Sequence, residues 1–155
     1  MERYYEEKHF VEDIGLYFEQ MGLPRMAGRV LGVLLIADPP VQSLNDLCEV
    51  LQASKSAIST AARLLIEMGL IERAPSLKPR EVAFQFKSGS WLVFIRMHLR
   101  LMGSLHQIAE RGLELLKDES PAVRGRLQEA HDMFSQIEQE LPALFRRIEE
   151  ERGQR

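Results

Sequence analysis

The stretch that decides the fold is residues 43–80, SLNDLCEVLQASKSAISTAARLLIEMGLIERAPSLKPR. Its first part predicts a helix that begins at Ser43, whose hydroxyl can accept from the free N–H groups of a helix start. Residues 52–54 predict a tight turn, and Ser54 caps a second helix that ends at Gly69. In each helix the apolar residues repeat at helical spacing, which predicts one buried face. They are Leu44, Leu47, Cys48 and Leu51 in the first helix, and Ile58, Ala61, Ala62, Leu65 and Met68 in the second.

A short β-hairpin is predicted after the second helix. Residues 70–73 form an extended run, and residues 82–87 alternate as a half-buried strand should, with Val82, Phe84 and Phe86 on its apolar side. The loop between the two runs contains two prolines and carries Lys78 and Arg80 at its tip. Two helices followed by a basic hairpin form a winged helix-turn-helix. The predicted fold class is therefore mainly α with a small β-hairpin.

The second helix carries a polar stripe opposite its apolar face. Short side chains let a helix backbone approach a groove closely, and the start of a helix favours a phosphate. An ordinary solvated helix face would also be polar, so the deciding feature is the basic hairpin that follows, which suits double-stranded DNA. The candidate DNA-binding residues are Ser54, Lys55, Ser56, Ser59, Thr60, Arg63, Lys78 and Arg80.

The charge of the chain is unevenly distributed. The net charge is −3, yet residues 54–87 hold six basic and three acidic side chains, which is 6 − 3 = +3. The N-terminal residues 2–19 are acidic. This pattern predicts a modest local footprint on DNA and argues against indiscriminate binding to nucleic acid.

Helices are predicted on both sides of the helix-turn-helix and its hairpin. Residues 3–21 carry Phe10, Ile14, Tyr17, Phe18 and Met21 on one face. A second helix, residues 24–37, has Gly28 and Gly32 four residues apart, which leaves room for another helix to pack closely.

Two longer helices are predicted after the hairpin, over residues 91–117 and from Ser120 onward. The last has an apolar seam from Val123 to Ile148, and Pro142 should kink it near Glu138. We expect the seam to pack both on the chain's own long helix and on a second subunit. The prediction is a homodimer on a palindromic operator, with residues 1–22 and 89–155 for dimerisation and residues 23–88 as the DNA-binding domain.

The sequence also resembles a known family. The runs FVEDIGLYFEQMGLPRMAGRVLGVLLIADPP (10–40) and SLNDLCEVLQASKSAISTAARLLIEMGLIER (43–73), and in outline ELPALFRR (140–147), are similar to the GbsR-like branch of the MarR-type winged helix regulators. The resemblance implies a dimeric transcriptional regulator, usually a repressor. It places recognition-helix contacts on Lys55, Ser56, Ser59, Thr60 and Arg63. The hairpin tip, APSLKPRE (74–81), departs from the glycine- and arginine-rich tip of many relatives.

A small-molecule effector is a further expectation from the resemblance. Several relatives in that branch are tied to choline or glycine betaine, whose quaternary ammonium group needs an aromatic cage. Tyr17, Phe18 and Trp91 are the candidate ligand-binding residues. Aromatic residues at helical spacing are also ordinary core residues, so both interpretations stay open.

The sequence offers little support for other site chemistry. His98, Met102, His106 and Glu110 repeat every four residues, but without a second ligand cluster we expect no metal and no cofactor. Cys48 is the single cysteine and shares an apolar helix face, which favours an inert buried thiol over a redox sensor. No phosphate loop or recognisable nucleophile is present, so we predict no enzyme.

The same fold is also compatible with a function other than DNA binding. A winged-helix adaptor that binds protein and not DNA would share this fold, but it should expose apolar anchors where this chain has its polar stripe. The longest apolar run, residues 30–37, is too short to span a bilayer, and no signal peptide is evident. We therefore expect a cytoplasmic protein without a membrane partner.

Overall fold

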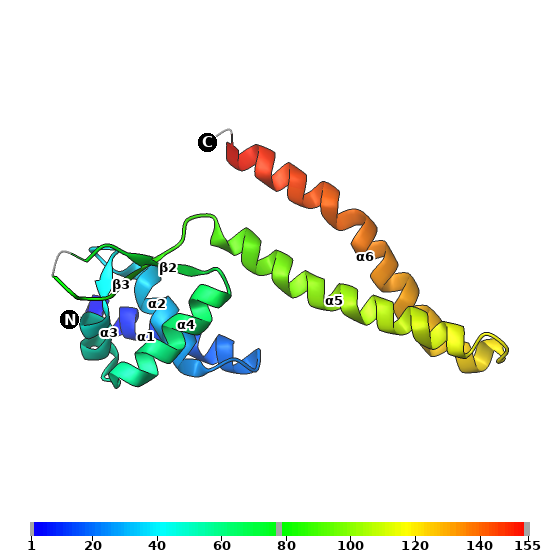
Figure 1. Cartoon of the computed structure of the whole chain (residues 1–155), viewed down its shortest axis with the longest axis horizontal. Coiled ribbons are helices and arrows are strands. Elements are labelled where there is room, and N and C mark those ends of the chain that lie inside the picture. Colours follow the sequence, from blue (N-terminus) through cyan, green and yellow to red (C-terminus); the bar gives the residue numbers. More distant parts are fainter. Residues whose placement is uncertain (1, 77–78, 154–155) are drawn as a thin grey trace. The chain divides into compact units, whose positions relative to one another are not determined.

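The computed structural model describes residues 2–76 and 79–153 (Figure 1). Its contacts divide the chain into two compact units, Met1–Ile95 and Arg96–Arg155. The elements are α1 (Glu2–Gln20), α2 (Arg25–Ile36), β1 (Gln42–Ser43), α3 (Leu44–Leu51), α4 (Lys55–Glu67), β2 (Ile71–Ala74), β3 (Ala83–Phe86), α5 (Ser90–Leu115) and α6 (Pro121–Gly153). This order confirms the predicted fold class, a mainly helical chain with a winged helix-turn-helix in its first unit. Among the described residues, no helix is both long enough and apolar enough to cross a membrane.

The wing is a three-stranded antiparallel sheet in the order β1-β3-β2. The predicted hairpin is confirmed by the pairing of β2 with β3, in which Ile71 faces Phe86 and Ala74 faces Ala83. Strand β1 was not predicted, because two residues are too short to show an alternating pattern. The apolar side predicted for the strand over residues 82–87 is wrong at Val82, which precedes β3 and is exposed, while Ala83 is buried in the central strand between two paired neighbours.

The predicted caps of the helix-turn-helix are confirmed. Ser43 and Asp46 form a capping box, in which the Asp46 N–H donates to Ser43 Oγ and the Ser43 N–H donates to Asp46 Oδ2, both at 3.0 Å. In the tight turn Gln52 adopts a left-handed conformation with φ of 49°. Ser54 Oγ accepts from the Ala57 N–H at 3.2 Å, and Gly69 ends the second helix with φ of 74°. These local signals set where α3 and α4 begin and end.

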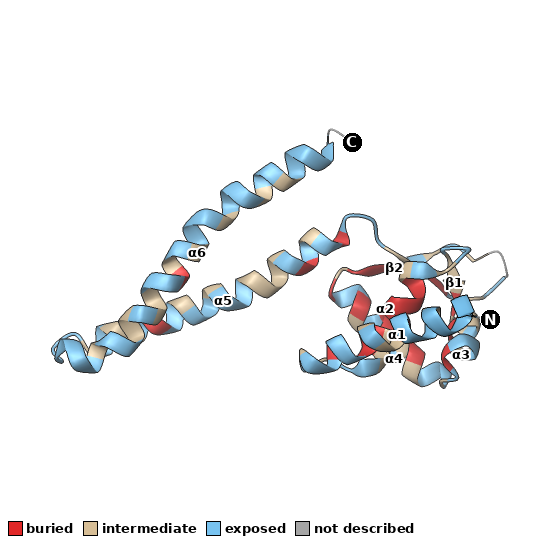
Figure 2. Cartoon of the chain, turned by 180° about the vertical axis from the view of Figure 1, so that it is seen from behind, coloured by how far each residue is buried: buried red, intermediate tan, exposed pale blue. Residues whose placement is uncertain are grey.

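The core of the first unit lies between α2, α3, α4 and the sheet. Helix α2 contacts α1, α4 and β3, which explains why it is apolar on most sides (Figure 2). The fully buried large side chains are Phe18, Val30, Leu31, Leu47, Ile58, Leu65, Leu70 and Ile71. One face of α4 therefore packs against the core, and its opposite face is exposed to solvent.

Helices α1 and α2 pack at close range through glycine. A Cβ added at Gly28 would lie 2.5 Å from the Ile14 carbonyl oxygen and 2.8 Å from Gly15 Cα, and one at Gly32 would lie 3.0 Å from Val11 Cα. The predicted close approach at Gly28 and Gly32 is thus confirmed, with α1 as the approaching helix.

The predicted buried face of α1 is partly wrong. Val11, Gly15 and Phe18 are buried, whereas Phe10 and Tyr17 are 36% and 52% exposed. The reason is the close crossing, since large side chains between two helices would hold their axes apart and only small ones fit against Gly28.

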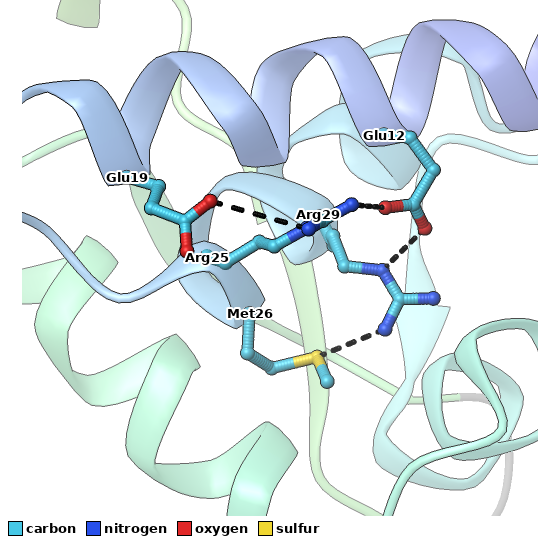
Figure 3. Close-up of polar contacts among 5 residues, drawn as sticks. All are labelled: Glu12, Glu19, Arg25, Met26 and Arg29. Carbon is cyan, nitrogen blue, oxygen red and sulfur yellow. Dashed lines mark hydrogen bonds and ion pairs between the residues drawn. The ribbon is translucent and has the colours of Figure 1, made fainter.

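Two arginines of α2 hold a glutamate of α1 at the edge of this helix pair (Figure 3). Glu12 Oε2 accepts from Arg25 Nη2 at 2.8 Å, and Glu12 Oε1 accepts from Arg29 Nε at 2.7 Å. Arg25 also lies 4.0 Å from Glu19. Partial burial opposes ionisation of Glu12, but the hydrogen bonds and charges of Arg25 and Arg29 outweigh it and lower the pKa of this carboxyl group.

We expect Glu12→Gln to lower the free energy of unfolding near pH 7 by about 1 kcal/mol, because a partly exposed pair of this kind contributes little more. A carboxylate with a lowered folded-state pKa stabilises the fold above its ordinary pKa of 4.5, and that contribution is lost as the pH falls through the lower folded-state value. Urea unfolding of both proteins from pH 7 to pH 3 measures this difference. A difference between the two proteins that did not shrink in acid would contradict the prediction.

The second unit consists of the remainder of α5 and all of α6. Arg96 Nη2 donates to Glu149 Oε1 at 2.7 Å, and His106 Nδ1 lies 2.8 Å from Glu138 Oε2. Helix α6 continues through Pro142, and its ribbon is curved (Figure 1). Between these helices lies an open groove of about 820 Å³ whose lining includes Leu99, Leu141 and Phe145. Two single helices therefore leave much of their apolar surface uncovered.

Candidate nucleic-acid interface

The polar stripe predicted on the second helix forms the solvent-facing side of α4. Ile58, Ala61, Ala62 and Leu65 are buried on the opposite side. Of the predicted residues, Ser54, Lys55, Ser56, Thr60 and Arg63 are exposed, and Ser59 is half-buried between them. Helix α4 is thus anchored through one face and presents short polar side chains and two cations on the other.

The start of α4 has the geometry of an anion site. Ser54 Oγ is occupied by the Ala57 N–H and lies 3.0 Å from Ser56 Oγ. The remaining first-turn N–H groups have no partner within a helix, and the helix dipole adds positive potential there. Lys55 adds a full charge at the same position. This end of α4 can therefore take a phosphate oxygen while the following turns face a base edge.

The wing supplies a second cationic position. Arg80 is exposed, and its backbone is left-handed with φ of 62°. Lys78, the other cation predicted at the hairpin tip, lies outside the described residues. The described parts of the β2–β3 connection and the start of α4 lie toward the same side of the first unit, at the left in Figure 1.

The wing is also bonded to α3. The Leu44 N–H donates to the Val82 carbonyl at 2.8 Å. Asn45 Nδ2 donates to Glu81 Oε1 at 3.1 Å, and Ser76 Oγ donates to Glu81 Oε2 at 3.1 Å. Sequence reasoning missed Asn45 and Glu81, because they are 36 residues apart and no local pattern connects them.

Comparison with known proteins agrees with this geometry. A family profile described as MarR family matches residues 21–80, and one described as MmpR5-like MarR family transcriptional regulator matches residues 89–151. The HTH-type transcriptional regulator MmpR5 of Mycobacterium tuberculosis is 37% identical over 145 residues, which cover 94% of this chain and 88% of that protein. This chain belongs to the MarR family.

Two further matches are also to proteins described as transcriptional regulators. A crystal structure described as that of a transcriptional regulator has a TM-score of 0.76 at 36% identity, and the match covers 94% of this chain and 99% of that one. The HTH-type transcriptional repressor OpcR of Bacillus subtilis is 26% identical over 91 residues, or 59% of this chain and 49% of that protein. Membership in the MarR family confirms the prediction of a regulator and not an enzyme.

The three candidate ligand-binding residues of this MarR family member lie in different surroundings. Phe18 is buried in the core at 2% exposure, while Tyr17 is half-exposed on α1. Trp91 packs against Phe86, with ring centroids 5.7 Å apart, and against Phe94, at 6.1 Å. Phe18 is therefore a core residue, whereas Trp91 is 37% exposed beside its two ring neighbours, and a role for the three in ligand binding stays a prediction.

The structure also shows what surrounds the candidate metal-binding residues and the thiol of Cys48. Within the described ranges, no group of three or more His, Cys, Asp or Glu residues could hold a metal ion. His106 pairs with Glu138 and lies against His131 of α6, with ring centroids 4.8 Å apart and the ring planes tilted by 53°. Cys48 is a free thiol of intermediate exposure, so the prediction of a buried thiol is only partly correct: its neighbours on the helix, Leu47 and Leu51, point more directly into the core.

Proposed function

We propose that this MarR family regulator binds double-stranded DNA sequence-specifically as a homodimer and represses transcription. The observation that carries the proposal is helix α4, whose buried face fixes it to the core and whose exposed face carries short polar residues together with Lys55 in the first turn and Arg63 two turns later. We propose that α4 enters the major groove and that Arg80 of the wing contacts the adjacent backbone or minor groove. The proposed contact residues are Ser54, Lys55, Ser56, Ser59, Thr60, Arg63 and Arg80, together with Lys78 from the sequence.

Uncovered apolar surface supports the proposal of a homodimer. On α1, Phe10 and Tyr17 are exposed beside the buried face formed by Val11, Gly15 and Phe18. In the second unit, the groove between α5 and α6 and the exposed apolar side chains of both helices call for a further covering surface. These side chains are Leu101, Met102, Leu105, Ile108, Leu115, Val123, Met133 and Leu144. A second copy of the chain would bury them and place two copies of α4 on two half-sites.

Selection of bound duplexes from a random pool, at a stated salt concentration, tests the proposed function. We expect an inverted repeat whose half-sites are about one helical turn apart, because two copies of α4 related by a two-fold axis read the same sequence on opposite strands. Failure to enrich any sequence would contradict sequence-specific binding and favour the protein-binding adaptor.

The oligomeric state is checked separately by analytical ultracentrifugation at micromolar concentration. A dimer that retains selected duplexes supports the proposal, and a monomer that enriches only single half-sites contradicts its dimeric part. Repression follows the description of the relative OpcR as a repressor, and a reporter gene behind the selected operator measures its sign. The GbsR-like branch, a small-molecule effector and a cytoplasmic location stay predictions from the sequence.

A further inference from the structure

We propose that Asn45 and Glu81 form a tether that sets the position of the wing relative to the helix-turn-helix, and so the reach of Arg80 toward DNA. The inference rests on the proposed DNA-binding function. Asn45 and Glu81 are positioning residues, because they act on the wing and need not touch DNA themselves.

The tether joins two segments through one carboxylate. Asn45, in the first turn of α3, donates to Glu81 Oε1 at 3.1 Å, and Ser76, in the β2–β3 connection, donates to Glu81 Oε2 at 3.1 Å. Glu81 thus holds the first helix of the helix-turn-helix with one oxygen and the wing connection with the other. A carboxylate suits this position because it accepts at both oxygens.

Among the described residues, backbone hydrogen bonds join the wing to the start of α3 at the base of the wing. The pairs Gln42 with Phe84 and Ser43 with Ala83, and the Leu44 N–H bond to Val82, fix β3 against the start of α3. The Asn45–Glu81 bond extends this attachment by one residue toward Arg80. Arg80, with φ of 62°, directly precedes Glu81, so holding Glu81 limits how far the arginine can move. Restricting a side chain before binding reduces the ordering entropy that association must overcome.

The direction in which a Glu81 substitution changes the DNA affinity separates a positioning role from simple charge repulsion. A carboxylate beside a phosphate-binding surface repels DNA, so its removal should strengthen binding if charge alone matters. If Glu81 positions the wing, Glu81→Ala should weaken binding despite the loss of a negative charge. Asn45→Ala carries no change in charge and breaks the same bond from the α3 side.

The test measures the affinity of full-length protein for its selected duplex by fluorescence anisotropy at fixed salt. We expect Asn45→Ala and Glu81→Ala each to weaken binding by about fivefold to tenfold, as for loss of one positioned contact. Gln85→Ala is the matched control, because Gln85 Nε2 donates to Glu72 at 2.8 Å within the same sheet without reaching α3. It should change the affinity less than twofold, or about 0.4 kcal/mol.

A double-mutant cycle with Arg80→Ala decides how Asn45 acts. If Asn45 works by positioning the wing, Asn45→Ala costs little once Arg80 is absent; additive losses would mean that Asn45 touches DNA directly and would overturn the tether. Stronger binding by Glu81→Ala would overturn it as well.

Hydrogen exchange provides a readout that needs no DNA. Asn45→Ala should speed amide exchange over residues 80–83 while Gln85→Ala leaves α3 unchanged, and unchanged exchange in Asn45→Ala overturns the tether. If the wild-type chain enriches no duplex while the two variants show this difference in exchange, the proposed function is refuted and the structural tether stands.

Discussion

Replacing Gly28 with alanine is expected to lower the free energy of unfolding by about 3 kcal/mol, at the upper end of overpacking effects. The added Cβ would lie 2.5 Å from the Ile14 carbonyl oxygen, 2.8 Å from Gly15 Cα and 2.9 Å from the Ile14 carbonyl carbon. All three atoms belong to the backbone of α1, so no side-chain rotation relieves the clash. Helix α1 must move away from α2, and the close packing of Val11 and Phe18 is lost with it.

Gly125→Ala is the matched control for this prediction. Gly125 also lies within a helix, but apart from its chain neighbours and the adjacent backbone of the same helix no described atom comes within 4 Å of its added Cβ. Alanine there should be neutral or stabilise the protein by up to about 1 kcal/mol through helix propensity. Urea unfolding followed by circular dichroism measures both variants. Equal stability of the two variants would show that α1 does not press against α2 at Gly28.

Combining Lys55→Ala with Arg63→Ala is expected to weaken binding to the selected duplex by at least about 100-fold, because a base or phosphate contact contributes about 1–3 kcal/mol. Both side chains are exposed on α4, so their removal leaves the buried face of the helix intact. The loss of Lys55 at the helix start should also reduce the salt dependence of binding.

The control removes the same charge elsewhere. Lys117 follows α5 and Arg152 lies in the last turn of α6, and both are exposed. Replacing these two residues by alanine changes the net charge equally but should leave DNA affinity within about threefold, because neither residue belongs to the proposed contact set and charges that contact no phosphate are screened at physiological salt. Circular dichroism and sedimentation are used to check that both double variants stay folded and associated. Unchanged DNA retention by the α4 variant would favour the adaptor over the DNA reader.

The parts of the fold that sequence patterns predicted are those that depend on neighbours along the chain. Ser43, Ser54 and Gly69 end or begin helices through hydrogen bonds and backbone conformations within a few residues, and each was predicted at its position. The exposed stripe of α4 followed in the same way from helical spacing.

The parts that were missed or wrong depend on partners far along the chain. The buried face of α1 follows from a contact with Gly28, and a helix with aromatic residues on two sides does not reveal which side meets a glycine. Strand β1 exists because two residues before α3 pair with β3, some 40 residues later.

By itself, the sequence determined the order of the helices and of the β2–β3 hairpin, the ends of α3 and α4 and the polar surface of α4, because spacing and capping are local properties. Only the tertiary structure decided that α1 lies against α2 through glycine, that β1 completes the wing and that Glu81 accepts a hydrogen bond from Asn45. These features require two segments to meet in space. No local pattern contains that information, because the energy of such a contact depends on both partners at once.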